Sequence, residues 1–269
     1  RGLMKIYQEV IMEKVIALEA RLRNCRNVKT LGVRPNFNDY TAHEKSAIRN
    51  AKKVYYPTQL YAELLDAMGK QIFPSVHKYL FSQDKIKQTA LFALLGIPHP
   101  KTRVFYGRRQ KTNVLDYFRY PFVAKKARGS AMGRDVFLIQ NKADLQNYLE
   151  GYTPAYIQAY LPVDRDMRVV VINGKIVHAY WRVAAKGEFR SNVAMGADVK
   201  LDPVPGNALD LALHTAAACG WNDVGLDICE HDGRFYVLEG NMKYGKEGFR
   251  AAGIDFYELM DTMIAKGEV

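Results

Sequence analysis

The sequence is poor in cysteine and histidine, and it has no long apolar run. Its three cysteines, Cys25, Cys219 and Cys229, lie far apart, without a Cys-x-x-Cys motif or a Cys/His pair. This spacing excludes a zinc finger and a disulfide framework, so we expect reduced thiols and a cytoplasmic protein. The six histidines form no His-Glu-x-x-His or related metal motif. No segment approaches the roughly 18–20 apolar residues of a membrane span, so we expect no membrane partner.

The N-terminus also lacks a secretion signal. No long apolar core follows residues 1–5, Arg-Gly-Leu-Met-Lys, which are typical of an expression remnant or an interior start. We therefore expect the natural beginning to be missing. The 269 residues are 48% hydrophobic and 25% charged, which is ordinary for a soluble globular protein of one large or two smaller domains.

Acidic residues are fewer than basic residues. The chain has 28 Asp and Glu against 39 Lys and Arg, a net charge of +11. A polyphosphate nucleotide, an acidic substrate or a solvated basic surface would each account for the excess. Nucleic acid is disfavoured as a partner, because the basic residues are spread along the chain and no zinc finger, recognition helix or aromatic RNA-binding signature occurs.

Apolar spacing and turn residues predict a mixture of helices and strands. The spacing over residues 4–23 predicts a helix. Thr41 with Glu44 forms a capping box, and a helix should begin at Ser82 and end at Gly96. We further expect strands at 54–57, 120–125, 136–139 and 155–159, and helices at 58–68, 142–150 and 208–219.

Two hairpin signals dominate the second half of the chain. Asn173-Gly174 separates β-rich runs at 167–172 and 175–183. Asp232-Gly233 does the same for runs at 224–229 and 234–239. Hairpin sheets covered by helices indicate an α+β fold.

The second hairpin carries the most informative side chains. It should place Asp227 roughly across from Glu239, and strand alternation points Asn241 to the same face as Glu239. Two carboxylates and an amide oxygen suit Mg²⁺, which completes its shell with water and phosphate. The alternative is a solvated strand face with chance acids, but apolar neighbours predict burial, where unpaired acids are costly.

A strand and a glycine-containing loop form a second candidate. Lys125 ends the strand at 120–125, and Gly129, Ser130 and Gly133 follow it. Such a loop allows backbone N–H groups to approach phosphates closely. It is not a Walker loop, since no Gly-Lys-Ser or Gly-Lys-Thr follows, and an ordinary β-hairpin remains an equal alternative.

Basic and amide side chains gather between residues 166 and 192. Arginine forks suit carboxylates and phosphates, although surface arginines are the commoner case. The candidates are Asp166, Arg168, Arg182, Arg190 and Asn192.

Together these segments resemble the ATP-grasp superfamily, and within it the RimK-type amino-acid ligases, from about residue 82 to the end. The matching segments are Asp84-Lys85 with Leu95-Gly96-Ile97-Pro98, Pro121-Phe122-Val123-Ala124-Lys125, Ile157-Gln158-Ala159-Tyr160-Leu161, Asp166-Met167-Arg168, Phe189-Arg190-Ser191-Asn192, and Asp227 with Glu239 and Asn241. The resemblance implies an ATP-grasp fold, in which two α+β subdomains sandwich ATP over residues 81–269. A short or truncated α/β region would occupy residues 1–80.

The resemblance also implies roles for individual residues. Lys85, Lys125, Gly129, Ser130, Gln158, Ala159, Tyr160, Leu161 and Asp166 would bind the nucleotide; Arg168, Arg182, Arg190 and Asn192 would act in catalysis; Asp227, Glu239 and Asn241 would bind Mg²⁺ or Mn²⁺. Two departures stand out. Ala159 replaces an acidic residue common in the family, and residues 242–249 replace a small-residue Pro-Gly turn.

The implied activity is an ATP-dependent carboxylate–amine ligase with an acylphosphate intermediate and ADP as product. It would add glutamate or a similar amino acid to a peptide or small molecule. A catalytically silent nucleotide-binding regulator and a basic nucleic-acid-binding protein are the alternatives. The oligomeric state stays open, with a homo-oligomer among the options.

Overall fold

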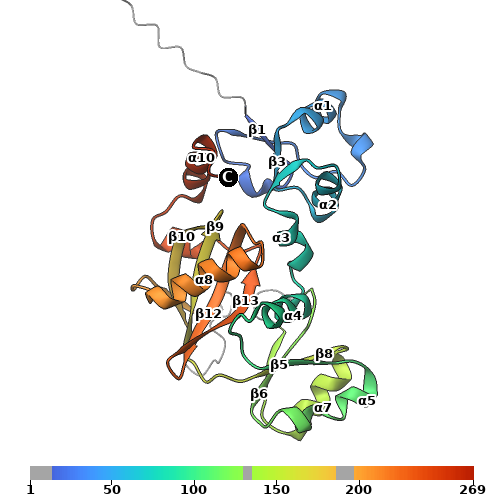
Figure 1. The fold of residues 1–269 in the computed structure, drawn as a ribbon, viewed down its shortest axis with the longest axis vertical. Helices are drawn as coiled ribbons and strands as arrows, with labels where there is room; N and C mark the ends of the chain where they lie inside the picture. Colours follow the sequence, from blue (N-terminus) through green and yellow to red (C-terminus); the bar gives the residue numbers. More distant parts are fainter. Residues whose placement is uncertain (1–13, 130–134, 186–196) are drawn as a thin grey trace, which may run out of the picture. The chain divides into compact units, whose positions relative to one another are not determined.

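The computed structural model describes residues 14–129, 135–185 and 197–269 (Figure 1). The chain divides into two compact units. The first runs up to Pro74 and includes Asp255–Val269, and the second is Ser75–Ile254. The expected boundary after residue 80 stays a prediction about domain organisation. None of the described helices is long and apolar enough to cross a membrane.

The first unit is built on a parallel four-stranded sheet in the order β2-β1-β3-β4. Its strands are β1 (Val15–Ala17), β2 (Val28–Thr30), β3 (Lys53–Tyr55) and β4 (Gln71–Phe73). Its helices are η1 (Ala20–Leu22), η2 (Phe37–Asp39), α1 (Ala42–Asn50), α2 (Gln59–Ala67) and α10 (Phe256–Ala265). Aliphatic and tyrosine side chains from strands and helices form one core.

One helix prediction was wrong, and a second helix begins three residues later than predicted but ends at Gly96 as expected. In the described part of residues 4–23, β1 and η1 replace the expected helix, because Ile16 and Ala17 are buried between parallel neighbours, and a short apolar run fits a buried strand as well as a helix. The helix expected to begin at Ser82 begins at Lys85, where Asp84 caps it by accepting from the Lys87 N–H. The Thr41–Glu44 capping box is confirmed.

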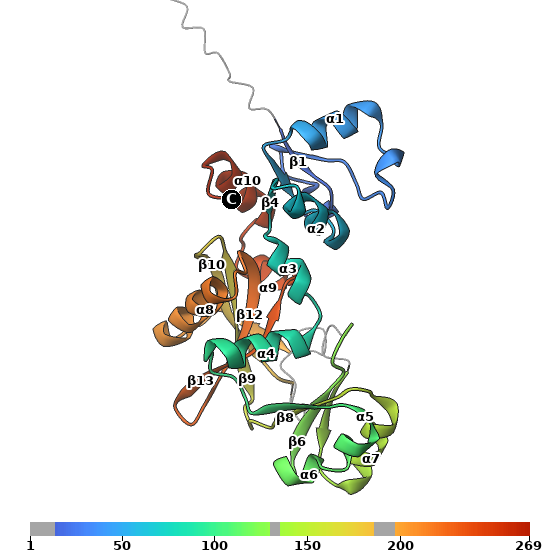
Figure 2. The ribbon, with the colours of Figure 1, turned by 45° about the vertical axis from the view of Figure 1, so that its right-hand side comes forward.

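The second unit contains a smaller sheet in the order β5-β8-β6-β7. Its strands are β5 (Thr102–Phe105), β6 (Phe122–Lys125), β7 (Val136–Ile139) and β8 (Ala155–Ala159). The helices α5 (Gly107–Lys111), α6 (Val114–Tyr117) and α7 (Lys142–Gly151) lie against it (Figure 2). One face of the sheet packs into their apolar core, through Phe122 and Ala124 of β6 among others. By alternation Val123 and Lys125 point to the opposite face.

A larger, antiparallel sheet completes the second unit in the order β11-β10-β9-β12-β13. Its strands are β9 (Arg165–Ile172), β10 (Lys175–Val183), β11 (Asp198–Lys200), β12 (Asp223–His231) and β13 (Arg234–Asn241). The helices of this part are α3 (Val76–Phe81), α4 (Lys85–Leu95), α8 (Gly206–Ala218) and α9 (Glu247–Ala251). Helix α8 lies across one face of the sheet, and side chains of α4 join the same core (Figure 1). Both predicted hairpins are confirmed.

On the face of this sheet that lies away from the apolar core, strand pairing brings charged side chains together. Asp227 lies opposite Glu239 on β13 and opposite Arg168 on β9. On β10, Arg182 lies opposite Asp166 of β9. The pairing of β12 with β13 shifts between Asp227 and Ile228 at a β-bulge. Residues directly opposite in antiparallel strands share a face, so charged side chains from four strands meet on one surface.

Candidate functional site

Four buried charges form the floor of the candidate site. The Arg168 guanidinium forms an ion pair with Asp227, in which Nε bonds Oδ1 and a terminal nitrogen lies 3.2 Å from Oδ2. Arg182 donates to both oxygens of Asp166 at 2.7 Å, and its NH2 lies 2.9 Å from Asp227 Oδ2. All four side chains are buried. Asp227 therefore binds two guanidinium groups at once, which offsets the cost of removing it from water.

Three further groups extend the floor toward the smaller sheet. The Asn241 Nδ2 donates to Asp227 Oδ2 at 2.9 Å and to Glu239 Oε1 at 3.3 Å. The other oxygen of Glu239 lies 3.1 Å from the Lys85 ammonium at the start of α4. The sequence prediction that Asp227, Glu239 and Asn241 share a face is confirmed by these contacts.

Charge balance within the site shifts two pKa values. Burial would raise the pKa of Glu239, but Lys85 and Lys125 outweigh it and lower the pKa to about 2. Burial lowers the pKa of Lys125 to about 8, although the attraction of Glu239 opposes this shift. Glu239 is therefore ionised at neutral pH, and Lys125 titrates close to neutrality.

Arg182 shows the opposite outcome for a buried cation. Burial would lower its pKa, but Asp166 and Asp227 raise it above the usual value. Arg182 therefore stays charged at neutral pH.

The residues present fit a divalent cation. Oxygens of Asp227 and Glu239 converge on the Asn241 amide group, and half a turn of that amide would replace its nitrogen with oxygen. Within the described residues, no group of three or more His, Cys, Asp or Glu side chains could hold a metal ion. A cation bound here would thus have two carboxylates and one amide oxygen, a set that suits Mg²⁺ with water and phosphate.

The segment that carries these acids and cations matches the model of a known family. Residues 82–264 match the RimK-like ATP-grasp domain. The chain belongs to the RimK-like ATP-grasp family. It is an ATP-dependent carboxylate–amine ligase, as the sequence predicted.

Curated relatives in this family share under a third of their residues with the chain. The coenzyme gamma-F420-2:alpha-L-glutamate ligase of Methanococcus maripaludis is 28% identical over 200 residues, which cover 71% of this chain and 69% of the relative. The beta-citrylglutamate synthase B of Homo sapiens is 29% identical over 201 residues, which cover 71% of this chain and 52% of the relative. The chain thus spans about half the length of the latter.

Solved structures confirm the ATP-grasp fold. A RimK domain ATP-grasp protein from Sphaerobacter thermophilus aligns with a TM-score of 0.68 at 16% identity, over 93% of this chain and 98% of that one. The ATP-grasp ligase PsnB, complexed with a minimal precursor, gives 0.66 at 18% identity over 95% and 99%. At this identity the likeness concerns the fold alone.

The remaining predicted residues of this RimK-like chain are placed as follows. Gln158 and Ala159 end β8, between β5 and β6, and Tyr160 and Leu161 follow directly. Gly129 has a φ of +63°, a conformation that favours glycine, and its N–H donates to the Gln83 carbonyl at 3.1 Å. Their contacts with nucleotide stay predictions. Ser130, Arg190 and Asn192 lie outside the described residues.

Sequence reasoning missed the residues that support this RimK-like site. The Gln88 side chain, on α4, donates to the Gly240 carbonyl and accepts from the Gly240 N–H, both at 2.9 Å. It thereby fixes β13 between Glu239 and Asn241. The signal in the sequence was Gln88 itself, a polar residue on the face of a helix that should be buried and therefore needs a hydrogen-bond partner.

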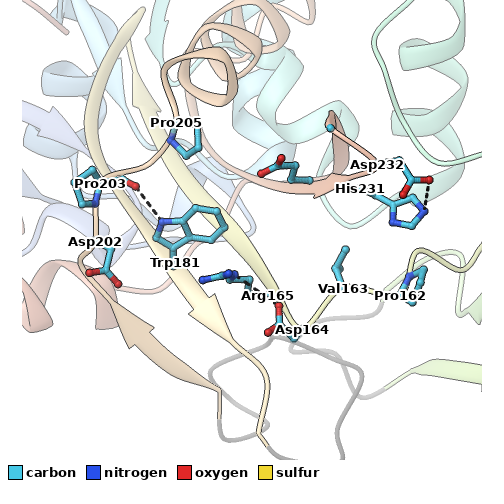
Figure 3. Close-up of a pocket in the computed structure, with 12 residues that line it drawn as sticks. Pro162, Val163, Asp164, Arg165, Trp181, Asp202, Pro203, Pro205, His231 and Asp232 are labelled. Atoms are coloured by element: carbon cyan, nitrogen blue, oxygen red, sulfur yellow. Dashed lines mark hydrogen bonds and ion pairs between the residues drawn. The ribbon is translucent and has the colours of Figure 1, made fainter.

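A separate hollow of about 700 Å³ lies at the ends of β10 and β12. Figure 3 shows Trp181 and Pro203 on one side of it and His231 and Asp232 on the other. None of the predicted site residues lines it. Its acids are solvated, since the side chains of Asp164 and Asp232 are 81% and 86% exposed. It is a surface groove distinct from the RimK-like site.

Proposed function

We propose that the protein uses Mg-ATP to join glutamate, or a similar amino acid, to the carboxyl group of a peptide or small molecule. The observation that carries the proposal is the convergence of Asp227, Glu239 and Asn241 beside four cationic side chains. Several curated relatives, named for alpha-L-glutamate ligase or citrylglutamate synthase activity, support glutamate as the amine.

The reaction has two steps. An oxygen of the acceptor carboxylate attacks the γ-phosphorus of ATP. The bond between that phosphorus and the oxygen bridging it to the β-phosphorus breaks, so ADP leaves and an acylphosphate forms. The amino group of the incoming amino acid then attacks the acyl carbon. Inorganic phosphate leaves, the nitrogen loses a proton, and an amide remains. Positioning and charge neutralisation account for most catalysis of such phosphoryl transfers.

The residues described here have separate tasks in this reaction. Lys85 and Lys125 neutralise phosphate charge, and Arg168 and Arg182 stabilise the charge that develops on the transferred group. Asp227, Glu239 and Asn241 would hold Mg²⁺, or Mn²⁺, whose charge would offset that of the phosphates. Within this proposal, the backbone of Gln158 to Leu161 contacts adenine and Asp166 lies near the ribose. Arg190 and Asn192 keep the catalytic role that the resemblance implies.

The test is ADP and phosphate release with Mg-ATP across a panel of amino acids and short peptides or small carboxylic acids. Turnover should require one acid and one amine, and it should fall at least about 1,000-fold in Asp227→Asn and Glu239→Gln. Asp232→Asn, at an exposed hairpin turn, is the matched control and should retain wild-type turnover.

Absence of turnover with every pair would reject glutamate and similar amino acids as the amine. If Mg-ATP then still raised the unfolding temperature of wild type but of neither site variant, nucleotide binding at the acid set would stand without the proposed substrates.

A further inference from the structure

Three buried polar side chains lie beside the site without belonging to the proposed machinery. Lys78 of α3 donates to Asp223 Oδ2 at 2.6 Å, and the Tyr244 hydroxyl donates to Asp223 Oδ1 at 2.6 Å. Asp223 is fully buried, and Lys78 and Tyr244 are 3% and 2% exposed. Burying a charge pair is costly, and a nonpolar replacement is often at least as stable. Stability alone therefore does not explain the three residues, which we call the Tyr244 network.

The Tyr244 network reaches the site through Gly225. Asp223, Gly225 and Asp227 alternate along β12, so they face the same side of the sheet. A Cβ atom added to Gly225 would lie 2.9 Å from Tyr244 Cβ and 3.0 Å from Arg168 Cδ. The stems of Tyr244 and Arg168 thus both border the small space that a side chain at Gly225 would fill. A shift of the tyrosine into that space would bring it toward the arginine stem.

The segment that departs from the family pattern supplies this tyrosine. Residues 242–249 follow Asn241 directly, and they fold back over the sheet. The ring of Phe249 stacks near Tyr244, with centroids 6.4 Å apart, and lies 5.1 Å from the ring of His178. The His178 ring nitrogen lies 3.0 Å from the Gly248 carbonyl oxygen. The segment is therefore fixed at both ends, and the bond to Asp223 fixes the end nearest to Arg168.

We propose that the Tyr244 network is a positioning device that holds Arg168 in its orientation toward Asp227 and the transferred group. This inference rests on the proposed ligase function. The tyrosine acts through Arg168, because its own hydroxyl is engaged by Asp223. Without the hydrogen bond to Asp223, the Tyr244 ring can move. The aliphatic part of Arg168 then no longer has a fixed neighbour on that side.

The first test replaces Tyr244 with phenylalanine, which retains the ring. We expect kcat to fall about tenfold, because a small misplacement of a catalytic group is costly, while the KM for ATP stays within about twofold. Tyr40→Phe is the matched control. Tyr40 is also buried, and its hydroxyl donates to the Gly32 carbonyl at 2.7 Å in the first unit. An equal loss of kcat in both variants would overturn the proposal.

A double-mutant cycle tests whether the effect passes through Arg168. Arg168→Lys alone should lower kcat about 100-fold, since the two-pronged guanidinium is lost. Adding Tyr244→Phe should then change kcat by less than about twofold. If Tyr244 acted independently of Arg168, the two losses of kcat would multiply. A further tenfold fall in kcat on adding Tyr244→Phe would therefore contradict the proposal.

A matched pair of double variants separates position from stability. Lys78→Met with Asp223→Asn keeps an oxygen that accepts from Tyr244, so kcat should stay within about threefold of wild type. Lys78→Met with Asp223→Leu removes the acceptor, and kcat should fall about tenfold at a similar unfolding temperature. Equal kcat values in these two variants would overturn the role of the hydroxyl bond.

A spectroscopic measurement keeps the inference separate from the proposed function. The Arg168 Nε–H donates to Asp227, so its ¹H–¹⁵N signal should exchange slowly with solvent. The signal is assigned by its loss in Arg168→Lys. Exchange should be faster in Tyr244→Phe and unchanged in Tyr40→Phe, whether or not any substrate pair turns over. Unchanged exchange in Tyr244→Phe rejects the inference alone, whereas absent turnover in wild type rejects the proposed substrates alone.

Discussion

The two sheets of the second unit shift the pKa of a cation beside the site in opposite directions. The larger sheet places Arg182 against Asp166 and Asp227, and the pKa of Arg182 is raised. The smaller sheet ends β6 with Lys125, whose pKa burial lowers to about 8. Both side chains face the same site, and both lose water. The difference teaches that direct contact with two carboxylates can outweigh burial, which raises the pKa of Arg182, whereas the attraction of Glu239 does not outweigh burial at Lys125.

The largest effect should come from breaking the ion pairs of the larger sheet. Arg182→Met would remove a guanidinium that pairs with two buried carboxylates, Asp166 and Asp227. The free energy of unfolding should fall by about 3–5 kcal/mol. Urea unfolding measures the change, with Arg234→Met, at an exposed position of β13, as the control expected within about 0.5 kcal/mol. A loss below about 1 kcal/mol for Arg182→Met would show that the larger sheet does not depend on these pairs.

The next effect should appear in the pH dependence of ATP binding. With a pKa of about 8, Lys125 loses its proton just above neutral pH, and the neutral amine attracts phosphate less well. The KM for ATP should therefore rise about tenfold between pH 7 and pH 9. Lys125→Arg keeps its charge and should remove this rise. The same alkaline rise in both proteins would assign it to another group.

A smaller effect of opposite sign should follow from removing the same lysine. Below pH 8 the folded protein holds a charge that burial disfavours, so Lys125→Met should raise the free energy of unfolding by about 1 kcal/mol while weakening ATP binding. Between pH 8 and pH 10.5 the unfolded chain binds more protons at Lys125 than the folded one, so wild-type stability rises with pH. The advantage of the variant should shrink over that range. If Lys125→Met were less stable than wild type at pH 7, Lys125 would stabilise the fold as Arg182 does, which would contradict the comparison of the two sheets.

The smallest effect should come from a neutral contact of the smaller sheet. The Tyr156 hydroxyl of β8 lies 2.6 Å from Thr89 Oγ1 of α4, and burial raises the pKa of Tyr156 to about 12. Tyr156→Phe should lower the free energy of unfolding by about 0.5–1 kcal/mol, with no change in its pH dependence near neutrality. Tyr106→Phe, at an exposed position, serves as the control in thermal unfolding. A loss comparable to that of Arg182→Met would remove the distinction between neutral and charged contacts.

The sequence predicted the hairpins and the acid set because both depend on neighbours along the chain. An Asp-Gly turn brings the two strands together, but regular pairing from that turn would place Asp227 opposite Leu238, and the bulge that shifts the pairing to Glu239 has no signal along the chain. The Tyr244 network was not predicted, because its contact between Lys78 and Asp223 joins residues 145 positions apart. The helix predicted over residues 4–23 was wrong for a related reason. Parallel neighbours 13 and more residues away bury Ile16 and Ala17, and helical spacing does not report such partners.

The bulge opposite Asp227 has a consequence for insertions and deletions. Asp227 pairs with Glu239, whereas the next residue, Ile228, pairs with Val237, so Leu238 is one residue extra on β13. Val237 is buried in the apolar core, and Glu239 lies on the opposite face with the charged groups. Losing Leu238 would therefore remove only the bulge, because consecutive residues of a regular strand also alternate, with Val237 in the core and Glu239 among the charged groups. Among relatives, a one-residue gap at this position is thus compatible with the same set of acids, whereas the loss of a paired residue elsewhere in β13 would turn part of the strand to the wrong face.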